Sequence, residues 1–167
     1  MPFRLLATFC VAVALFTAGC RMADGPLPEP TAEDLNRLDD LRRDIGNVVG
    51  GNAEARQDFL DDLMVFVKPG SKPEAPAAIA ELAKLIGDAA TAAQLKEASL
   101  PPLLRQVWTA VVARELSERQ VATLQADVKA TLTGLNVPGP SAQAISSQIV
   151  VVQKAVTDRG RRWYEVF

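Results

Sequence analysis

After residue 30 the chain repeats apolar side chains at intervals of three and four positions, the spacing that places them on one face of an α-helix. A first helix is predicted to begin at Thr31, because Thr31-Ala32-Glu33-Asp34 has the form of a capping box. Gly50-Gly51-Asn52 ends this helix, and Asn52 is a suitable cap for the next. Residues 31–68 therefore predict a helical hairpin. Its two apolar stripes consist of Leu35, Leu38, Leu41, Ile45 and Val48, and of Phe59, Leu63, Phe66 and Val67.

The remaining pattern is also helical. A third helix is predicted over about 76–87, followed by a separate short alanine-rich segment over 89–98. Pro101-Pro102 suit the first turn of a helix, and the pattern leaves open whether residues 101–133 form one helix or two. A last helix is predicted from near Ser141. The fold class is therefore all-α: residues 31–167 predict an antiparallel bundle of five or six helices. Trp108, at helical spacing with Leu104 and Val111, is expected in its core.

The beginning of the chain has a different pattern. Arg4 precedes an apolar stretch over residues 5–18, which is too short to span a bilayer and is typical of a secretory signal peptide. Phe16-Thr17-Ala18-Gly19-Cys20 resembles the lipobox of bacterial prolipoproteins, although Thr17 stands where leucine is commonest. The resemblance covers residues 1–20. It implies that residues 1–19 are removed and that Cys20 is acylated. The alternative is a plain secretory leader with an incidental cysteine.

The lipobox resemblance also implies a cellular location. The protein would be held in the cell envelope by membrane lipid attached to Cys20. In the lipoprotein family, Asp after the lipidated cysteine often favours the inner membrane. Arg21 stands there in this chain, which favours the periplasmic face of the outer membrane where there are two membranes. Residues 20–30 predict a tether, because the prolines between Gly25 and Pro30 are incompatible with regular helix.

Composition excludes several kinds of chemistry. The chain has no histidine, its two cysteines are Cys10 in the leader and Cys20, and its net charge is −2. Catalytic triads, thiol nucleophiles and imidazole or thiolate metal sites therefore cannot be built after processing. No glycine-rich phosphate loop is present, and the mild charge does not indicate nucleic-acid binding. We expect no enzyme activity, no cofactor and no metal.

Carboxylates gather on the predicted hairpin at helical spacing. They are Asp39, Asp40 and Asp44 on its first helix, and Glu54, Asp58, Asp61 and Asp62 on its second. The favoured interpretation is a solvated face with Arg37, Arg42 and Arg43 as partners. The alternative is a site for a divalent cation, or an acid/base pair for glycan cleavage that uses Asp61 or Asp62. The scarcity of aromatic residues weighs against glycan binding.

Leu116-Ser117-Glu118-Arg119-Gln120 resembles one copy of the LTxxQ motif of periplasmic helical chaperones, with serine in place of threonine. The resemblance implies chaperone activity as an alternative function. The same residues also have the form of a capping box, which is the interpretation we favour.

One cluster near the end of the chain combines cations with aromatic rings, and its members are candidate partner-binding residues. Gly160 is well placed to end a helix there, and arginines at a helix C-terminus meet the negative end of its dipole. We expect Trp163 and Phe167 to dock on the protein's own bundle, with a partner protein as the alternative acceptor. The cluster consists of Arg159, Arg161, Arg162, Trp163, Tyr164 and Phe167.

The sequence therefore predicts a membrane-anchored envelope lipoprotein whose helical module binds another protein or supports the envelope without catalysis. A carboxylate-dependent hydrolase of cell-wall glycan is the alternative from a different class, and a chaperone of the LTxxQ type is the other.

Overall fold

The computed structural model describes residues 26–157, and this part of the chain is helical, with no β-strand. Six α-helices and one short 3-10 helix follow each other along it. Their bounds are α1 Ala32–Val49, α2 Ala55–Met64, α3 Ala75–Ala93, η1 Glu97–Ser99, α4 Pro101–Val112, α5 Glu118–Gly134 and α6 Gly139–Val156. The prediction of an all-α fold with five or six helices is confirmed.

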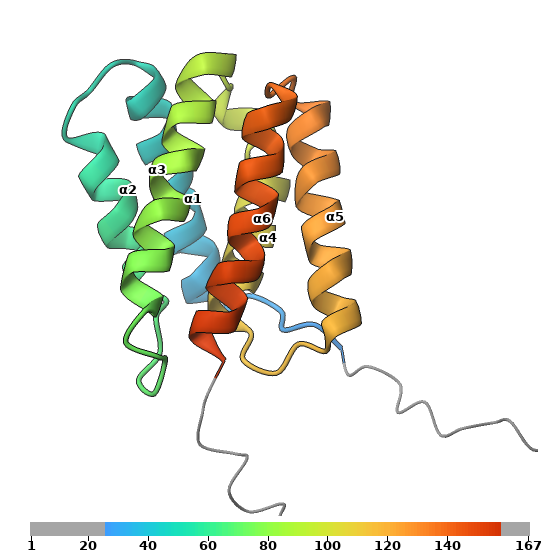
Figure 1. The fold of residues 1–167 in the computed structure, drawn as a ribbon. Helices are drawn as coiled ribbons and strands as arrows, with labels where there is room; N and C mark the ends of the chain where they lie inside the picture. The colour runs from blue at the N-terminus through green and yellow to red at the C-terminus, as the bar shows by residue number, and fades with distance from the viewer. Residues whose placement is uncertain (1–25, 158–167) are drawn as a thin grey trace, which may run out of the picture.

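The helices form two layers around a common core. In Figure 1, α3, α6 and α5 lie side by side nearest the viewer, with α1 and α4 behind them and α2 at one flank. Helix α6 packs mainly against α3 and α5, and also against α4. Trp108 is 2 % exposed and belongs to the core, as predicted. The segment 26–30 and the C-terminal end of α6 lie at the same end of the bundle (Figure 1).

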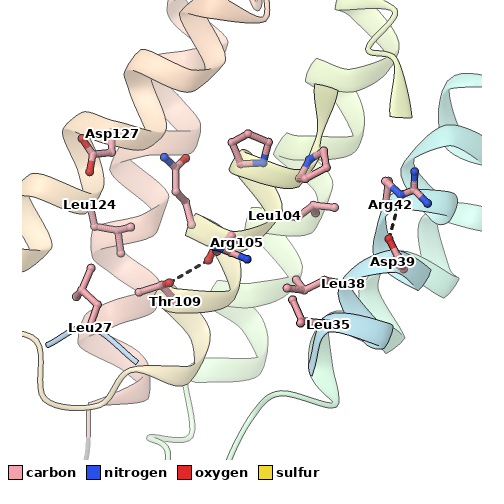
Figure 2. A pocket seen from close by; sticks show the side chains of 13 residues that line it. Leu27, Leu35, Leu38, Asp39, Arg42, Leu104, Arg105, Thr109, Leu124 and Asp127 are labelled. Atoms are coloured by element: carbon pink, nitrogen blue, oxygen red, sulfur yellow. Dashed lines mark hydrogen bonds and ion pairs between the residues drawn. The ribbon is translucent and has the colours of Figure 1, made fainter. Parts of the chain in front are cut away.

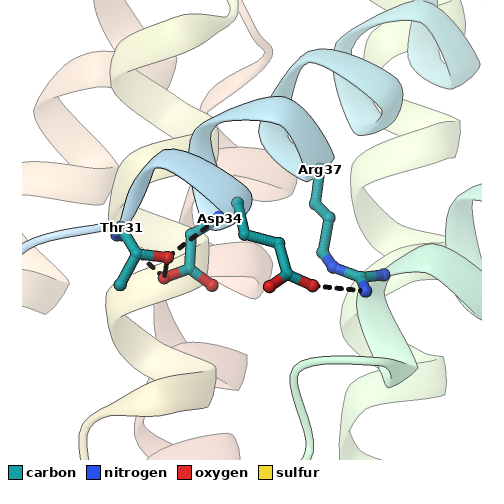
Figure 3. A network of polar contacts seen from close by, with 4 residues as sticks. Thr31, Asp34 and Arg37 are labelled. Atoms are coloured by element: carbon teal, nitrogen blue, oxygen red, sulfur yellow. Dashed lines mark hydrogen bonds and ion pairs between the residues drawn. The ribbon is translucent and has the colours of Figure 1, made fainter.

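Two helices begin at the capping boxes that the sequence predicts. Before α1, the Asp34 backbone N–H donates to Thr31 Oγ1 at 3.2 Å, and the Thr31 N–H donates to Asp34 Oδ2 at 2.9 Å (Figure 3). Before α5, the Gln120 N–H donates to Ser117 Oγ at 3.1 Å, and the Ser117 N–H donates to Gln120 Oε1 at 2.9 Å. Each box satisfies two backbone donors. The second box separates α4 from α5, so residues 101–133 form two helices.

Helix α3 corrects the predicted boundary after residue 87. It continues without a break to Ala93, because alanine has the highest helix propensity and nothing in this stretch stops it. Gly87 lies inside the helix and is buried, where α3 passes the first hairpin. A Cβ at this position would lie 3.2 Å from Arg56 Nη1 and 3.8 Å from Val48 Cγ1. The helix ends at Ala93, and the following residue, Gln94, adopts the left-handed conformation with φ 50° as its C-cap.

Smaller corrections concern caps and ends. Asn52 does not cap α2: its Oδ1 accepts from the Glu54 N–H at 3.0 Å and orders the turn before the helix. Helix α2 ends at Met64, so Phe66 and Val67 follow it in the connection. Helix α6 begins at Gly139, two residues before the predicted start.

Leu35 is the one member of the predicted first stripe that is not buried. It is 45 % exposed, whereas Leu38, Leu41, Ile45 and Val48 are all buried. Helical spacing identifies a face of α1, but it does not show how far the neighbouring helices cover that face. At its position the surface of the bundle is hollowed.

Among the described residues, no helix is both long and apolar enough to cross a bilayer. The predicted leader, Cys20 and the cluster from Arg159 to Phe167 lie outside these residues.

Candidate functional site

A groove runs along the outward side of α4, which α1 and α5 flank. Its volume is about 580 Å³. The floor comes from α4, one wall from α1 and the other from α5, and Leu27 of the N-terminal segment closes one end (Figure 2). We call it the α4 groove. Its lining is Leu27, Leu35, Leu38, Asp39, Arg42, Pro101, Pro102, Leu104, Arg105, Gln106, Thr109, Leu124 and Asp127.

The α4 groove concentrates exposed apolar surface. Leu27 is 48 % exposed and Leu35 is 45 % exposed, and among the described residues only Val65 and Val151 are large apolar side chains of similar exposure. Beneath Leu27 and Leu35 the lining continues into the buried Leu38, Leu104 and Leu124. A contiguous apolar surface of this kind is typical of a site that another group covers.

Polar groups surround this apolar centre. Arg42 Nε lies 3.3 Å from Asp39 Oδ1 on the α1 wall. On the floor, Gln106 Nε2 donates to Thr131 Oγ1 of α5 at 3.0 Å and fixes that wall to α4.

Two charges of the lining have no such partner. Within residues 26–157, Arg105 and Asp127 make no ion pair, so the groove offers one cation and one anion to whatever occupies it.

Sequence reasoning missed this groove. Leu27 was predicted as part of a tether, and Leu35 as a member of the apolar stripe of the first helix. The available signal was Leu27 itself, a large apolar residue between two prolines.

A second hollow, of about 610 Å³, lies between α1, α2 and η1 and is lined mainly by carboxylates. We call it the acidic hollow. The structure brings together most of the two predicted acidic rows, but Asp39 lies in the α4 groove instead and Glu54 is not part of the lining. Glu97 joins from η1, which the spacing within the hairpin could not indicate. The lining is Asp40, Arg43, Asp44, Asn47, Asp58, Asp61, Asp62 and Glu97.

The proximity of these carboxylates changes the protonation of Asp44. Burial and the negative charges of Asp62 and Asp58 raise the pKa of Asp44 to about 6. Other members of the hollow are partnered: Arg43 forms an ion pair with Asp40, and Gln57 Nε2 donates to Asp61 Oδ1 at 2.7 Å. Asp58 and Asp61 are exposed.

The acidic hollow could hold a proton between Asp44 and Asp62, since two close carboxylates share a proton more readily than both ionise. In the part of the chain that the structure describes, no three acidic side chains are placed to hold a metal ion. The lining contains no aromatic side chain on which a sugar ring could stack.

Comparison with protein-family models, with curated proteins and with solved structures found no match to this chain.

Proposed function

We propose that the protein is a lipid-anchored envelope protein whose non-catalytic helical module binds an apolar segment of another envelope protein. The α4 groove is the observation that supports this proposal best. It combines exposed leucines with a cation and an anion that form no ion pair within residues 26–157, so it offers both burial and orientation to a bound segment.

The position of the groove fits a membrane anchor at Cys20. Leu27 lines the groove and lies seven positions after Cys20. Because an extended chain covers about 3.3 Å per residue, lipid at Cys20 would hold the groove within about 25 Å of the membrane surface. A partner in the same membrane would then meet the groove at high local concentration.

Crosslinking in the intact envelope tests this function. The lipidated protein is crosslinked and captured, and its partners are compared with those of Leu35→Glu and of the matched control Val151→Glu. Both positions are about half exposed, so both variants should fold, but only Leu35 lines the groove. Loss of the captured protein in Leu35→Glu and its retention in Val151→Glu are expected. Equal capture by the two variants would contradict groove binding.

Hydrolysis of cell-wall glycan is the second candidate, because Asp44, with its pKa raised to about 6, lies near the carboxylate Asp62. The general acid of a glycosidase is a carboxyl group with a raised pKa that works together with a second carboxyl group. Incubation of the purified protein with peptidoglycan tests it. Release of soluble fragments that is lost in Asp62→Asn and kept in Asp127→Asn would replace the binding proposal with an enzymatic one.

The positions of the motif residues do not favour the chaperone alternative. Ser117 and Gln120, which carry the resemblance to the LTxxQ motif, are both engaged in the capping box of α5. If the purified protein suppressed the aggregation of a client protein, that result would support the chaperone alternative.

A further inference from the structure

We infer that the α4 groove binds an amphipathic α-helix of another protein, one that carries a carboxylate in the middle of its apolar face. Large apolar side chains stand three and four positions before and after this carboxylate. The carboxylate pairs with Arg105, and the apolar side chains cover the leucines of the two walls. The inference rests on the proposed function and names the kind of segment that the groove fits.

The surroundings of the groove favour a helix over an extended segment. Its floor and both walls are helices, and residues 26–157 contain no strand to whose edge an extended segment could add. A segment that enters an apolar groove must still satisfy its backbone N–H and C=O groups. A helix does this within itself. The occupant is therefore a helix that lies along α4, between α1 and α5.

The floor of the groove sets the length of the contact. The lining residues of α4 run from Pro101 to Thr109, and eight steps of about 1.5 Å make about 12 Å, slightly more than two turns. On a helix that lies on this floor, the positions three and four before and after a central residue lean to its two sides. These five positions also span eight steps. They present one central side chain to α4 and apolar side chains to each wall.

Arg105 is the cation on the floor between the two walls. In Figure 2 it lies between Leu27 and Leu124 on one side and the leucines of α1 on the other. Among the described residues it forms no ion pair, so it can pair with the central residue of the occupant. A carboxylate there is attracted, whereas a lysine is repelled. Asp127 of the α5 wall likewise favours a cation at that edge of the occupant.

The chain does not carry this pattern itself. No aspartate or glutamate of the sequence has large apolar residues at all four of the positions three and four before and after it. A second copy therefore offers no suitable helix, and the occupant belongs to a different protein.

A designed peptide tests the pairing with Arg105. It has about 15 residues, with glutamate at the centre, leucine three and four positions to either side, and alanine, lysine or glutamine elsewhere. Its binding to the full chain is measured by fluorescence anisotropy, beside that of a peptide with lysine at the centre. We expect the parent to bind the glutamate peptide about fivefold or more tightly. Arg105→Glu should reverse this preference. Arg119→Glu, an equal charge change on α5 outside the groove lining, should leave it unchanged.

A third peptide tests the helix. Proline replaces alanine two positions after the central glutamate, a position opposite the apolar face, so no contact with the groove is lost. Because proline disrupts a helix interior, we expect binding to weaken about a hundredfold. Binding of the glutamate peptide should also weaken in Leu35→Glu and stay unchanged in Val151→Glu, since only Leu35 lines the groove.

Several outcomes would overturn the inference. They include no binding of the glutamate peptide and an unchanged preference in Arg105→Glu. Equal binding of the proline peptide would assign the groove to an extended segment and would leave the proposed function intact. A parent protein that sediments as a dimer, with a monomeric Leu35→Glu variant, would assign the groove to a second copy. Failure to capture a partner from the envelope, with peptide binding as expected, would contradict the proposed function alone, so the two can fail separately.

Discussion

Asp44 lies on α1 opposite the carboxylates of α2, and both its partial burial and its neighbours oppose its charge. Its pKa is raised from 3.8 to about 6, with burial as the largest cause and Asp62 and Asp58 next. Between these two values the native protein binds more protons than the unfolded chain. The contribution of Asp44 to the free energy of unfolding should therefore fall as the pH rises from about 4 to about 6, and the loss should persist at higher pH.

Asp44→Asn removes this penalty. We expect the variant to be more stable than the parent above pH 6 and to have a flatter stability profile between about pH 4 and 6. Urea unfolding at a series of pH values measures both effects.

Asp127→Asn is the matched control, since Asp127 belongs to the α4 groove and not to the acidic hollow. If Asp44→Asn follows the parent's profile in parallel across this range, the assignment of the raised pKa is wrong.

The role of a single residue was predictable from the sequence where neighbouring positions alone determine it. The capping boxes at Thr31 and Ser117 are local, because two residues three positions apart supply every hydrogen-bonding atom. The exposure of Leu35 was not predictable, since it depends on which distant helices cover α1. The raised pKa of Asp44 was not predictable either, because it depends on burial in the folded bundle and on the charges of Asp62 and Asp58, which α2 brings close.

At the scale of helices, α6 stabilises the end of α4. Gln153 is 2 % exposed, and its amide donates to the carbonyl oxygens of Ala110 and Ala113, which lie at the end of that helix. Helix ends leave carbonyl groups without intrahelical partners. A buried side chain from another helix therefore supplies the cap that α4 does not provide for itself.

Gln153→Met keeps the volume of the side chain but removes both hydrogen bonds. Because the two carbonyl groups would stay buried without a donor, we expect a loss of about 1–3 kcal/mol in the free energy of unfolding. Thermal or urea denaturation measures it. Gln143→Met, on an exposed part of the same helix, should cost much less. Equal losses in the two variants would show that the amide of Gln153 does not cap α4.

Helix number and type were predictable because periodic apolar positions and glycine or proline breaks recur along the chain. The error in α3 has a physical cause. Gly87 lies at the predicted end of this helix, but in the bundle it lies inside α3, close to Val48 and Arg56. A glycine can mark either the end of a helix or a position where two helices lie close together, and the sequence does not distinguish the two.

At the scale of the molecule, periodicity does not say which helices become neighbours. The α4 groove exists because α1 and α5 flank α4 and leave one side of it open, and the residues on that side read as an ordinary polar face. The acidic hollow was predictable in part. The carboxylates of α1 and α2 are close in sequence and were predicted to gather, whereas the position of Glu97 depends on where η1 packs.

The proposed anchor gives a prediction for the whole protein. Cys20→Ala should abolish incorporation of labelled palmitate and normal lipoprotein processing, because acylation requires the thiol of Cys20. Metabolic labelling followed by gel analysis measures both. Cys10→Ala removes the other cysteine of the chain and should leave labelling unchanged. Palmitate that is still incorporated in Cys20→Ala would refute the anchor.

The described segment starts and finishes at one end of the bundle (Figure 1), and this has a mechanical consequence. A pull on residues 26 and 157 would act across the helices and not along them. Contacts between helices would then separate one after another, as in unzipping, and not all together, as in shear. Tension along the chain would therefore first loosen the contacts beside the end of α6 and the α4 groove.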